Sequence, residues 1–240
     1  MFLKKYEENL TMLIINADDF GKDHNVNTAI LECFNKKMIS SASIMANMPG
    51  FDEACKIAED YDLTHLIGVH LVLTEGVPLT EGIKNTHFCS PDGHFILTRK
   101  KRLLCLNKKE KDVIATEIKN QIEKCKRFNL PLTHLDSHHH IHEEWAVLRL
   151  ILPLLSEYKI PHIRILNNMN TSSNRLKRIY RSLINRYLIS EKISRSHYFG
   201  TRRDYDHFSQ LIPMNLPDKP IEIVIHPTLD QSGRVIDAMQ

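Results

Sequence analysis

The chain has 240 residues, of which 42% are hydrophobic and 25% are charged, and its formal net charge is +3. This length allows one α/β domain of barrel size, and so weak a positive charge does not indicate nucleic acid as a partner. Five cysteines without a CxxC pair indicate a reducing, cytoplasmic environment. The N-terminus shows no signal-peptide pattern, and no apolar run reaches the ~18 residues that span a bilayer, so no membrane partner is expected.

Short apolar runs alternate with amphipathic segments along the chain. The predicted strands are residues 12–16, 41–46, 66–73, 132–137, 161–166 and 221–225. The predicted helices are residues 27–37, 51–61, 109–128 and 143–158, and a basic helical stretch follows up to about 212. The alternation predicts an α/β fold with a parallel sheet, either barrel or doubly wound. Residues 1–240 are expected to form a single domain with insertions at about 74–108 and 167–215, and long loops of this kind commonly build or cover active sites.

Acidic and histidine side chains accompany several of the predicted strands. The first strand ends in Asn16-Ala17-Asp18-Asp19-Phe20-Gly21, the third carries His70, and the last ends in His226-Pro227. In parallel α/β folds the C-terminal ends of the strands form the ligand-binding face. We therefore expect two acids and several histidines, distant in sequence, to converge on that face.

The densest polar cluster is Thr133–His142, which holds five histidines and an aspartate. Imidazole and carboxylate are the usual protein ligands of divalent metals. An extended backbone would place His138, His140 and His142 on one face and His139 on the other. We then expect His140 and His142 to line a substrate cleft, and Asp136 to orient an imidazole from behind.

Each motif also has a simpler structural explanation. Asp18-Asp19 fits a polar turn that caps the next helix. His70 fits a hydrogen-bonded histidine of the core, and His226-Pro227 is a weak signal by itself. The convergence of all these groups on one face favours a functional site, because a cap or a core histidine explains only one motif at a time.

The four motifs together resemble those of the YdjC-like carbohydrate deacetylases, a family that includes the chitooligosaccharide deacetylases. The motif around His70 reads Gly68-Val69-His70-Leu71-Val72-Leu73-Thr74, and the match runs from about residue 12 to 230. The resemblance implies a distorted (β/α) barrel of the polysaccharide-deacetylase or TIM-like type, a divalent metal, usually magnesium, and a homodimer. Carried over residue by residue, it makes Asp19, His70 and His138 the metal ligands, Asp18 the catalytic base and His226 the acid or oxyanion partner.

The chemistry follows from such a ligand set. Two histidines and one carboxylate leave coordination positions for water and substrate, and histidine ligands also suit zinc in place of magnesium. With Asp18 as base, an activated water would attack an acetamide and yield acetate and an amino sugar. The predicted function is the deacetylation of chitooligosaccharides or related carbohydrates, so the expected partner is a small acetylated oligosaccharide.

Two other functions stay open at this point. Another metal-dependent hydrolase, acting on a phosphoester or a cyclic amide, would be favoured by a carboxylated lysine or a second metal, and no lysine lies at a predicted strand end. A non-catalytic protein that binds metal or sugar is the second alternative. The pair Asp18-Asp19 argues against it, because one carboxylate suffices to bind the metal and the second needs another role.

Overall fold

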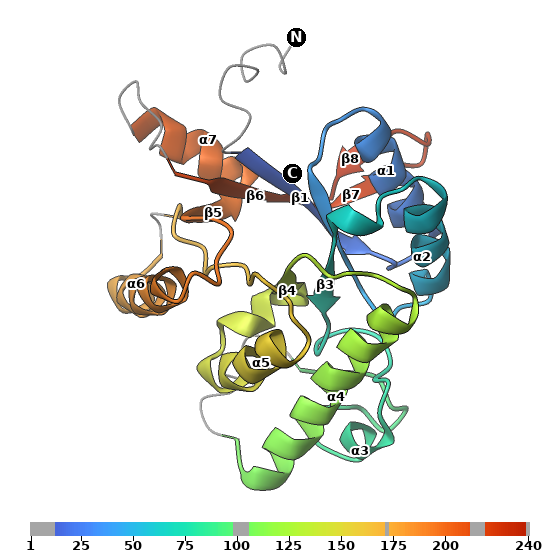
Figure 1. Cartoon of the computed structure of the whole chain (residues 1–240), viewed down its shortest axis with the longest axis vertical. Coiled ribbons are helices and arrows are strands. Elements are labelled where there is room, and N and C mark those ends of the chain that lie inside the picture. The colour runs from blue at the N-terminus through green and yellow to red at the C-terminus, as the bar shows by residue number, and fades with distance from the viewer. Residues whose placement is uncertain (1–12, 98–105, 171–172, 212–218, 239–240) are drawn as a thin grey trace.

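The structure is a computed structural model that describes residues 13–97, 106–170, 173–211 and 219–238. At its centre lies a six-stranded sheet in the order β4-β3-β2-β1-β6-β5, and every neighbouring pair is parallel (Figure 1). The strands are β1 (Leu13–Phe20), β2 (Ser41–Ile44), β3 (Ile67–Leu71), β4 (Leu135–Ser137), β5 (Tyr198–Thr201) and β6 (Ile221–Ile225). The predicted α/β fold with a parallel sheet is confirmed.

Helices connect most of these strands, and local sequence explains where several of them begin. The side chain of Asp23 accepts a hydrogen bond from the Val26 N–H, and Asn107 with Glu110 forms a capping box. The four predicted helices are confirmed with small shifts at their ends. The helices are α1 (His24–Asn35), α2 (Phe51–Asp60), α3 (Glu81–Lys84), α4 (Lys108–Arg127), α5 (Trp145–Glu157), α6 (Arg175–Ser190) and α7 (Arg202–Leu211), with 3₁₀ turns η3 (Thr64–Leu66) and η4 (His138–Glu143).

Single-residue bridges link the two edges of the sheet. Ile163 pairs in parallel with Leu135 of β4 on one side and with Ser194, just before β5, on the other. The Ile163 N–H donates to the carbonyl of Ile193 at 2.7 Å. The sheet is therefore curled, and this curl brings its two edges toward the same side.

The predicted strand at residues 161–166 is wrong, because only Ile163 pairs within it. Pro161 has no N–H to donate to a ladder. The Leu166 N–H donates instead to the side chain of Asn185 on α6, at 2.8 Å. The segment therefore lacks a strand hydrogen bond at Pro161, and its Leu166 N–H bonds to helix α6 instead of to a neighbouring strand.

The C-terminal third differs further from the prediction. The basic stretch after residue 167 contains α6 and α7 as expected, but β5 lies between them. A short antiparallel hairpin, β7 (Pro227–Leu229) and β8 (Val235–Asp237), follows His226 and was not predicted. That residues 74–108 and 167–215 are insertions on a single domain stays a prediction.

The main core fills the space between the sheet and helices α1, α2, α4 and α5. All four residues of β2 and all five of β3 are buried, which fits strands of a parallel sheet that is covered on both sides. Ile30, Ile118 and Ile151 contribute from the helices with no exposed surface. Among the described residues, no helix combines the length and apolarity needed to cross a bilayer.

Candidate active site

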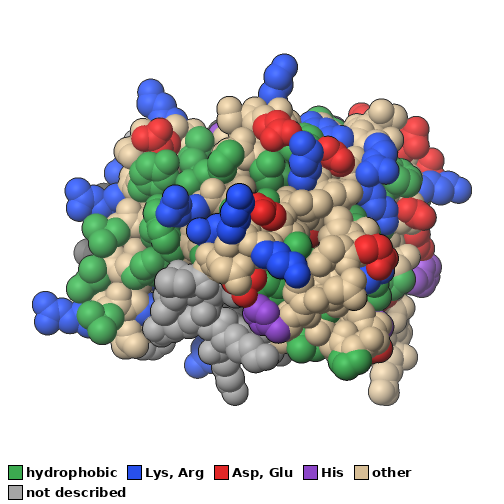
Figure 2. Space-filling model, turned by 90° about the horizontal axis from the view of Figure 1, so that it is seen from below, with side chains coloured by type: hydrophobic (Ala, Val, Ile, Leu, Met, Phe, Trp, Pro, Cys, Tyr) green, Lys and Arg blue, Asp and Glu red, His purple; other side chains and the backbone are tan. Residues whose placement is uncertain are grey.

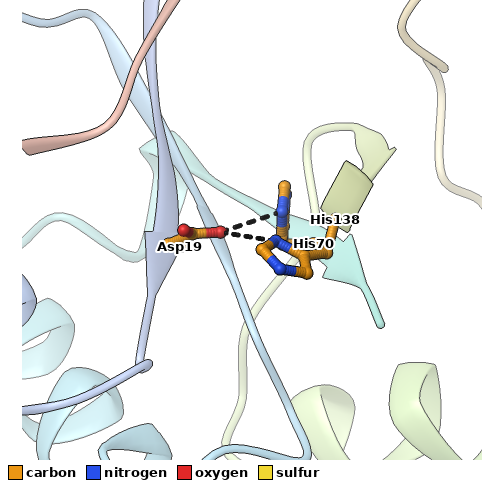
Figure 3. Close-up of side chains that lie close together, drawn as sticks. All are labelled: Asp19, His70 and His138. Carbon is orange, nitrogen blue, oxygen red and sulfur yellow. Dashed lines mark hydrogen bonds and ion pairs between the residues drawn. The ribbon is translucent and has the colours of Figure 1, made fainter. Parts of the chain in front are cut away.

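Three predicted side chains meet at the carboxyl ends of the strands. Asp19 comes from β1, His70 from β3, and His138 directly follows β4. The Asp19 Oδ1 atom lies 3.2 Å from His70 Nε2 and 3.1 Å from His138 Nδ1, so one carboxylate oxygen faces both rings (Figure 3). One ligand atom from each residue falls within 4.8 Å of the other two. All three residues are buried, and the spacing is that of a site able to hold one metal ion.

A local irregularity in β1 aims the two aspartates. The pairing of β1 with β2 shifts register between Ala17 and Phe20. Within this bulge Asp19 adopts φ 70°, a left-handed conformation that is uncommon outside glycine. In a regular strand Asp18 and Asp19 would point to opposite faces, whereas here both carboxylates approach the His70 ring. Backbone strain of this kind persists where surrounding structure imposes it, often at functional sites.

His70 is oriented by a carboxylate behind it. Its Nδ1 atom lies 2.8 Å from Asp136 Oδ1, while its buried Nε2 atom faces the Asp19 carboxylate at 3.2 Å. With the Nδ1 proton donated to Asp136, the Nε2 lone pair is directed at the metal position, which is the common carboxylate–histidine–metal arrangement. Burial alone would lower the pKa of His70, but the charges of Asp136 and Asp18 raise it to about 10. One carboxylate and two imidazoles around one point fit a divalent cation, which would displace the Nε2 proton of His70 on binding. Asp136 lies behind His70, as the sequence predicted.

Asp18 is held by a buried arginine. The guanidinium of Arg164 donates to both carboxylate oxygens of Asp18, at 2.8 and 2.7 Å. Asn16 donates to the same carboxylate at 2.9 Å. Burial alone would raise the pKa of Asp18, but the charges of Arg164 and then His70 hold it well below the usual range. Asp18 is therefore a fixed carboxylate that stays ionised beside the three-residue site.

Arg164 also links Asp18 to two other buried carboxylates, a network that the sequence interpretation missed. It contacts Asp136 at 2.6 Å and Glu222 at 2.7 Å, and Glu222 in turn pairs with Arg195 at 2.8 Å. Arg164 and Glu222 have no exposed surface. A signal was present in each case: a lone charged residue interrupts an apolar run, in Ile163-Arg164-Ile165 and in Ile221-Glu222-Ile223.

The histidine cluster is not extended, although the predicted alternation of its side chains between two faces required an extended backbone. Residues 138–143 form the 3₁₀ turn η4, and His139 and His140 both adopt φ 52°. The expected alternation of faces is therefore wrong. His140 lines the cavity described below, whereas His142 has no exposed surface and lies against Ser137. Burial, and secondly the charge of His140, lower the pKa of His142 to about 3. His142 is therefore a neutral buried ring and does not line the cavity.

A cavity of about 920 Å³ opens over these residues. His226 faces it, with Nε2 4.0 Å from Asp18 Oδ2. Glu75, which was not predicted, lies 2.7 Å from His138 Nε2 and 3.2 Å from the Lys22 ammonium. Helices α6 and α7 and the loop before α6 also line the cavity, through Asn167, Lys177, Arg181, Arg203, Asp204 and His207.

Comparisons with known proteins agree on one group of relatives. The family model described as YdjC-like protein matches residues 12–240. A carbohydrate deacetylase from Brevibacillus brevis is 33% identical over 222 residues, which cover 92% of this chain and 83% of that protein. A carbohydrate deacetylase from Geobacillus stearothermophilus is 36% identical over 148 residues, which cover 62% of this chain and 57% of that protein.

A solved structure shows the same fold. The crystal structure of a protein from Enterococcus faecalis V583 superposes with a TM-score of 0.71. The match covers 92% of this chain and 82% of that one, at 23% sequence identity. At this identity the likeness concerns the fold alone, and it supports the curled parallel sheet described above.

Proposed function

Because this chain belongs to the YdjC-like protein family, we propose that it is a metal-dependent hydrolase that removes acetyl groups from N-acetylated sugars. The relatives named carbohydrate deacetylase support the reaction class. The single structural observation that carries the proposal is that the adjacent carboxylates of Asp18 and Asp19 have different partners. Asp19 faces two histidine rings, and Asp18 is held ionised beside them by Arg164.

Asp19, His70 and His138 are the proposed metal ligands. A divalent cation held there supplies Lewis acidity to an acetamide carbonyl and to water. Magnesium is the ion proposed from the family resemblance, and zinc is the alternative because two of the three ligands are imidazoles. Elemental analysis of the purified protein distinguishes the two ions.

The proton transfers fall to Asp18 and His226. In amide hydrolysis water loses a proton as it attacks the carbonyl carbon, and the amine gains one as the C–N bond breaks. We assign the first transfer to Asp18, whose carboxylate is fixed and ionised, and the second to His226, 4.0 Å away. Acetate and an amino sugar are the products, and no further co-reactant is needed.

His140 is the proposed contact with the sugar, since its ring lies on the cavity wall. His142 is not carried forward in that role, because it is fully buried. A chitooligosaccharide substrate, a homodimer and a cytoplasmic location remain proposals that come from the resemblance and the composition. We also infer that the bridges at Ile163 complete a distorted barrel, since they connect β4 to the segment that leads into β5.

Acetate release tests the proposal. Purified protein supplied with Mg²⁺ or Zn²⁺ should release acetate from N-acetylglucosamine oligomers, and Asp18→Asn should reduce the rate ~10²–10⁴-fold. The control is Asp52→Asn, which changes an exposed aspartate on α2 and should leave the rate unchanged. Metal binding without acetate release from any acetylated sugar would contradict the proposal and favour a binding protein.

A further inference from the structure

Helix α6 presents an apolar row to solvent. Leu176, Ile179, Leu183 and Tyr187 are spaced by three or four residues, so they lie along one face of the helix. Their side chains are 79%, 48%, 60% and 43% exposed. We call these four residues the apolar row. Single exposed hydrophobic residues are ordinary on protein surfaces, but a contiguous row on one helix face indicates a binding surface.

The opposite face fixes this helix to the domain. Arg181 pairs with Glu143 at 3.1 Å, and the Asn185 amide exchanges two hydrogen bonds with the Leu166 backbone, at 2.8 and 2.7 Å. Leu188 is fully buried in the core. The apolar row is therefore held outward by packing on the other side, and α6 lies at the periphery of the molecule in Figure 1.

The exposed surface beside the apolar row is cationic. Between Arg175 and Ser190 the helix contains five Lys or Arg residues and no Asp or Glu. Arg175, Arg178 and Arg186 form no ion pair with any residue that the structure describes. They line a second cavity of about 760 Å³ together with Lys219. Figure 2 shows hydrophobic and basic side chains next to one another on its left, the side on which α6 lies in Figure 1.

We propose that α6 docks this protein on an anionic lipid surface, with the apolar row in the interface and the arginines on the headgroups. A basic amphipathic helix binds such surfaces because apolar insertion and charge attraction add, where neither alone gives stable binding. This revises the expectation of no membrane partner, which rested on the lack of a spanning segment. The proposal does not depend on the deacetylase assignment.

A second copy of the chain fits this surface less well. A two-fold contact would place α6 against α6, and Arg175, Arg178 and Arg186 of both copies would approach one another. The helix offers no acidic residue to pair with them, so like charges would meet at low separation. A surface of lipid phosphates supplies the missing negative charge.

Docking would also set the position of the catalytic cavity. Lys177 and Arg181 of α6 line that cavity, so one helix borders both the proposed lipid surface and the site of Asp19 and His70. The mouth of the cavity would lie beside the membrane rather than away from it.

Vesicle flotation of the full chain tests the proposal. We expect the protein to float with vesicles of phosphatidylcholine and phosphatidylglycerol at about 0.1 M salt, and to stay in solution with phosphatidylcholine alone or at about 0.5 M salt. Replacing Arg175, Arg178 and Arg186 by Gln should weaken binding on the order of 100-fold, at ~1 kcal/mol for each charge. Leu176→Gln with Leu183→Gln should abolish flotation.

The matched control is Met38→Gln with Tyr61→Gln, which removes two exposed apolar side chains outside α6 and should leave flotation unchanged. Because the changed side chains of α6 are exposed, circular dichroism should confirm that all variants are folded. Flotation that ignores lipid charge, or that survives the Leu176 and Leu183 changes, would overturn the proposal. So would a dimer in sedimentation velocity that the same two changes dissociate.

Discussion

The two aspartates at the end of β1 belong to contrasting regions, although they are adjacent in sequence. Asp18 lines the cavity but is held from the interior side by Arg164, which joins three buried carboxylates. Asp19 also lines the cavity, and its carboxylate faces the rings of His70 and His138. We call these regions the interior network and the cavity site. The charges of the interior network are paired within the protein. In the cavity site, the Asp19 carboxylate and the imidazoles of His70 and His138 lie close enough together to bind a metal ion.

The two regions show how the fold both pairs its buried charges and positions the ligands of a metal site. Buried charges are costly unless they are paired, so each charge of the interior network needs its partner in the folded protein. A metal site needs the reverse, namely ligands held in place but not satisfied by one another. His70 and Asp136 lie at the boundary, because Asp136 belongs to the interior network and fixes the ring that serves the cavity site.

The largest effect should follow from breaking the interior network. Arg164→Met removes the arginine that Asp18 and Asp136 share and leaves Glu222 with Arg195 alone, which should cost ~3–5 kcal/mol of unfolding free energy and abolish activity. Arg164→Lys keeps the charge but not the two-pronged geometry, so it should lose less stability. Urea unfolding at neutral pH measures both variants. Equal stability of Arg164→Met and the parent protein would show that the two regions do not differ as described.

Breaking the cavity site should separate activity from stability. His138→Gln removes a proposed ligand while nearly keeping the volume, so metal affinity should fall by more than ~100-fold and the melting temperature of the metal-free protein should change little. His65→Gln is the control, because this histidine is exposed and does not line the cavity. Isothermal titration with Mg²⁺ and Zn²⁺ gives the affinities. Retained affinity in His138→Gln would remove His138 from the ligand set.

Replacing Asp136, which lies at the boundary of the two regions, should change both metal affinity and stability by intermediate amounts. Asp136→Asn can no longer hold the Nδ1 proton of His70 as a charged acceptor, and residues in this position typically change metal affinity ~10–100-fold. The variant should also lose some stability, since Asp136 pairs with Arg164. Titration and unfolding of the same sample give both numbers. A change in stability with no change in affinity would place Asp136 in the interior network alone.

The effect that is smallest at neutral pH concerns His142, because its contribution to stability changes only below pH 6.5. The pKa of His142 is lowered from 6.5 to about 3 in the folded chain, so the unfolded chain takes up a proton first as the pH falls. Stability from this group is present above pH 6.5 and is lost as the pH falls toward 3. His142→Asn should flatten the fall of unfolding free energy in this window. His65→Asn, at an exposed histidine, is the control and should leave the slope unchanged.

Elements with a strong local pattern were predicted well. Helix α4 follows from its periodic apolar positions and its capping box, and β6 follows from the run Ile221–Ile225. Weak local patterns failed: β5 is short and polar at its ends, and the segment around Ile163 pairs through one residue only. In both cases the partner strand, not the segment itself, decides whether hydrogen bonds form.

The sequence by itself determined which motifs end the strands, because residue type and strand periodicity are local properties. It therefore indicated Asp18, Asp19, His70 and His138 as one group. Only the tertiary structure decided which aspartate is held by an arginine and which faces the two imidazoles, since this depends on the bulge in β1 and on Arg164, 146 residues from Asp18. It also decided that His142 is buried, because two left-handed residues turn the histidine run inward. Backbone conformation at single residues leaves no local pattern, and a lone charged residue in an apolar run indicates burial without naming its partner.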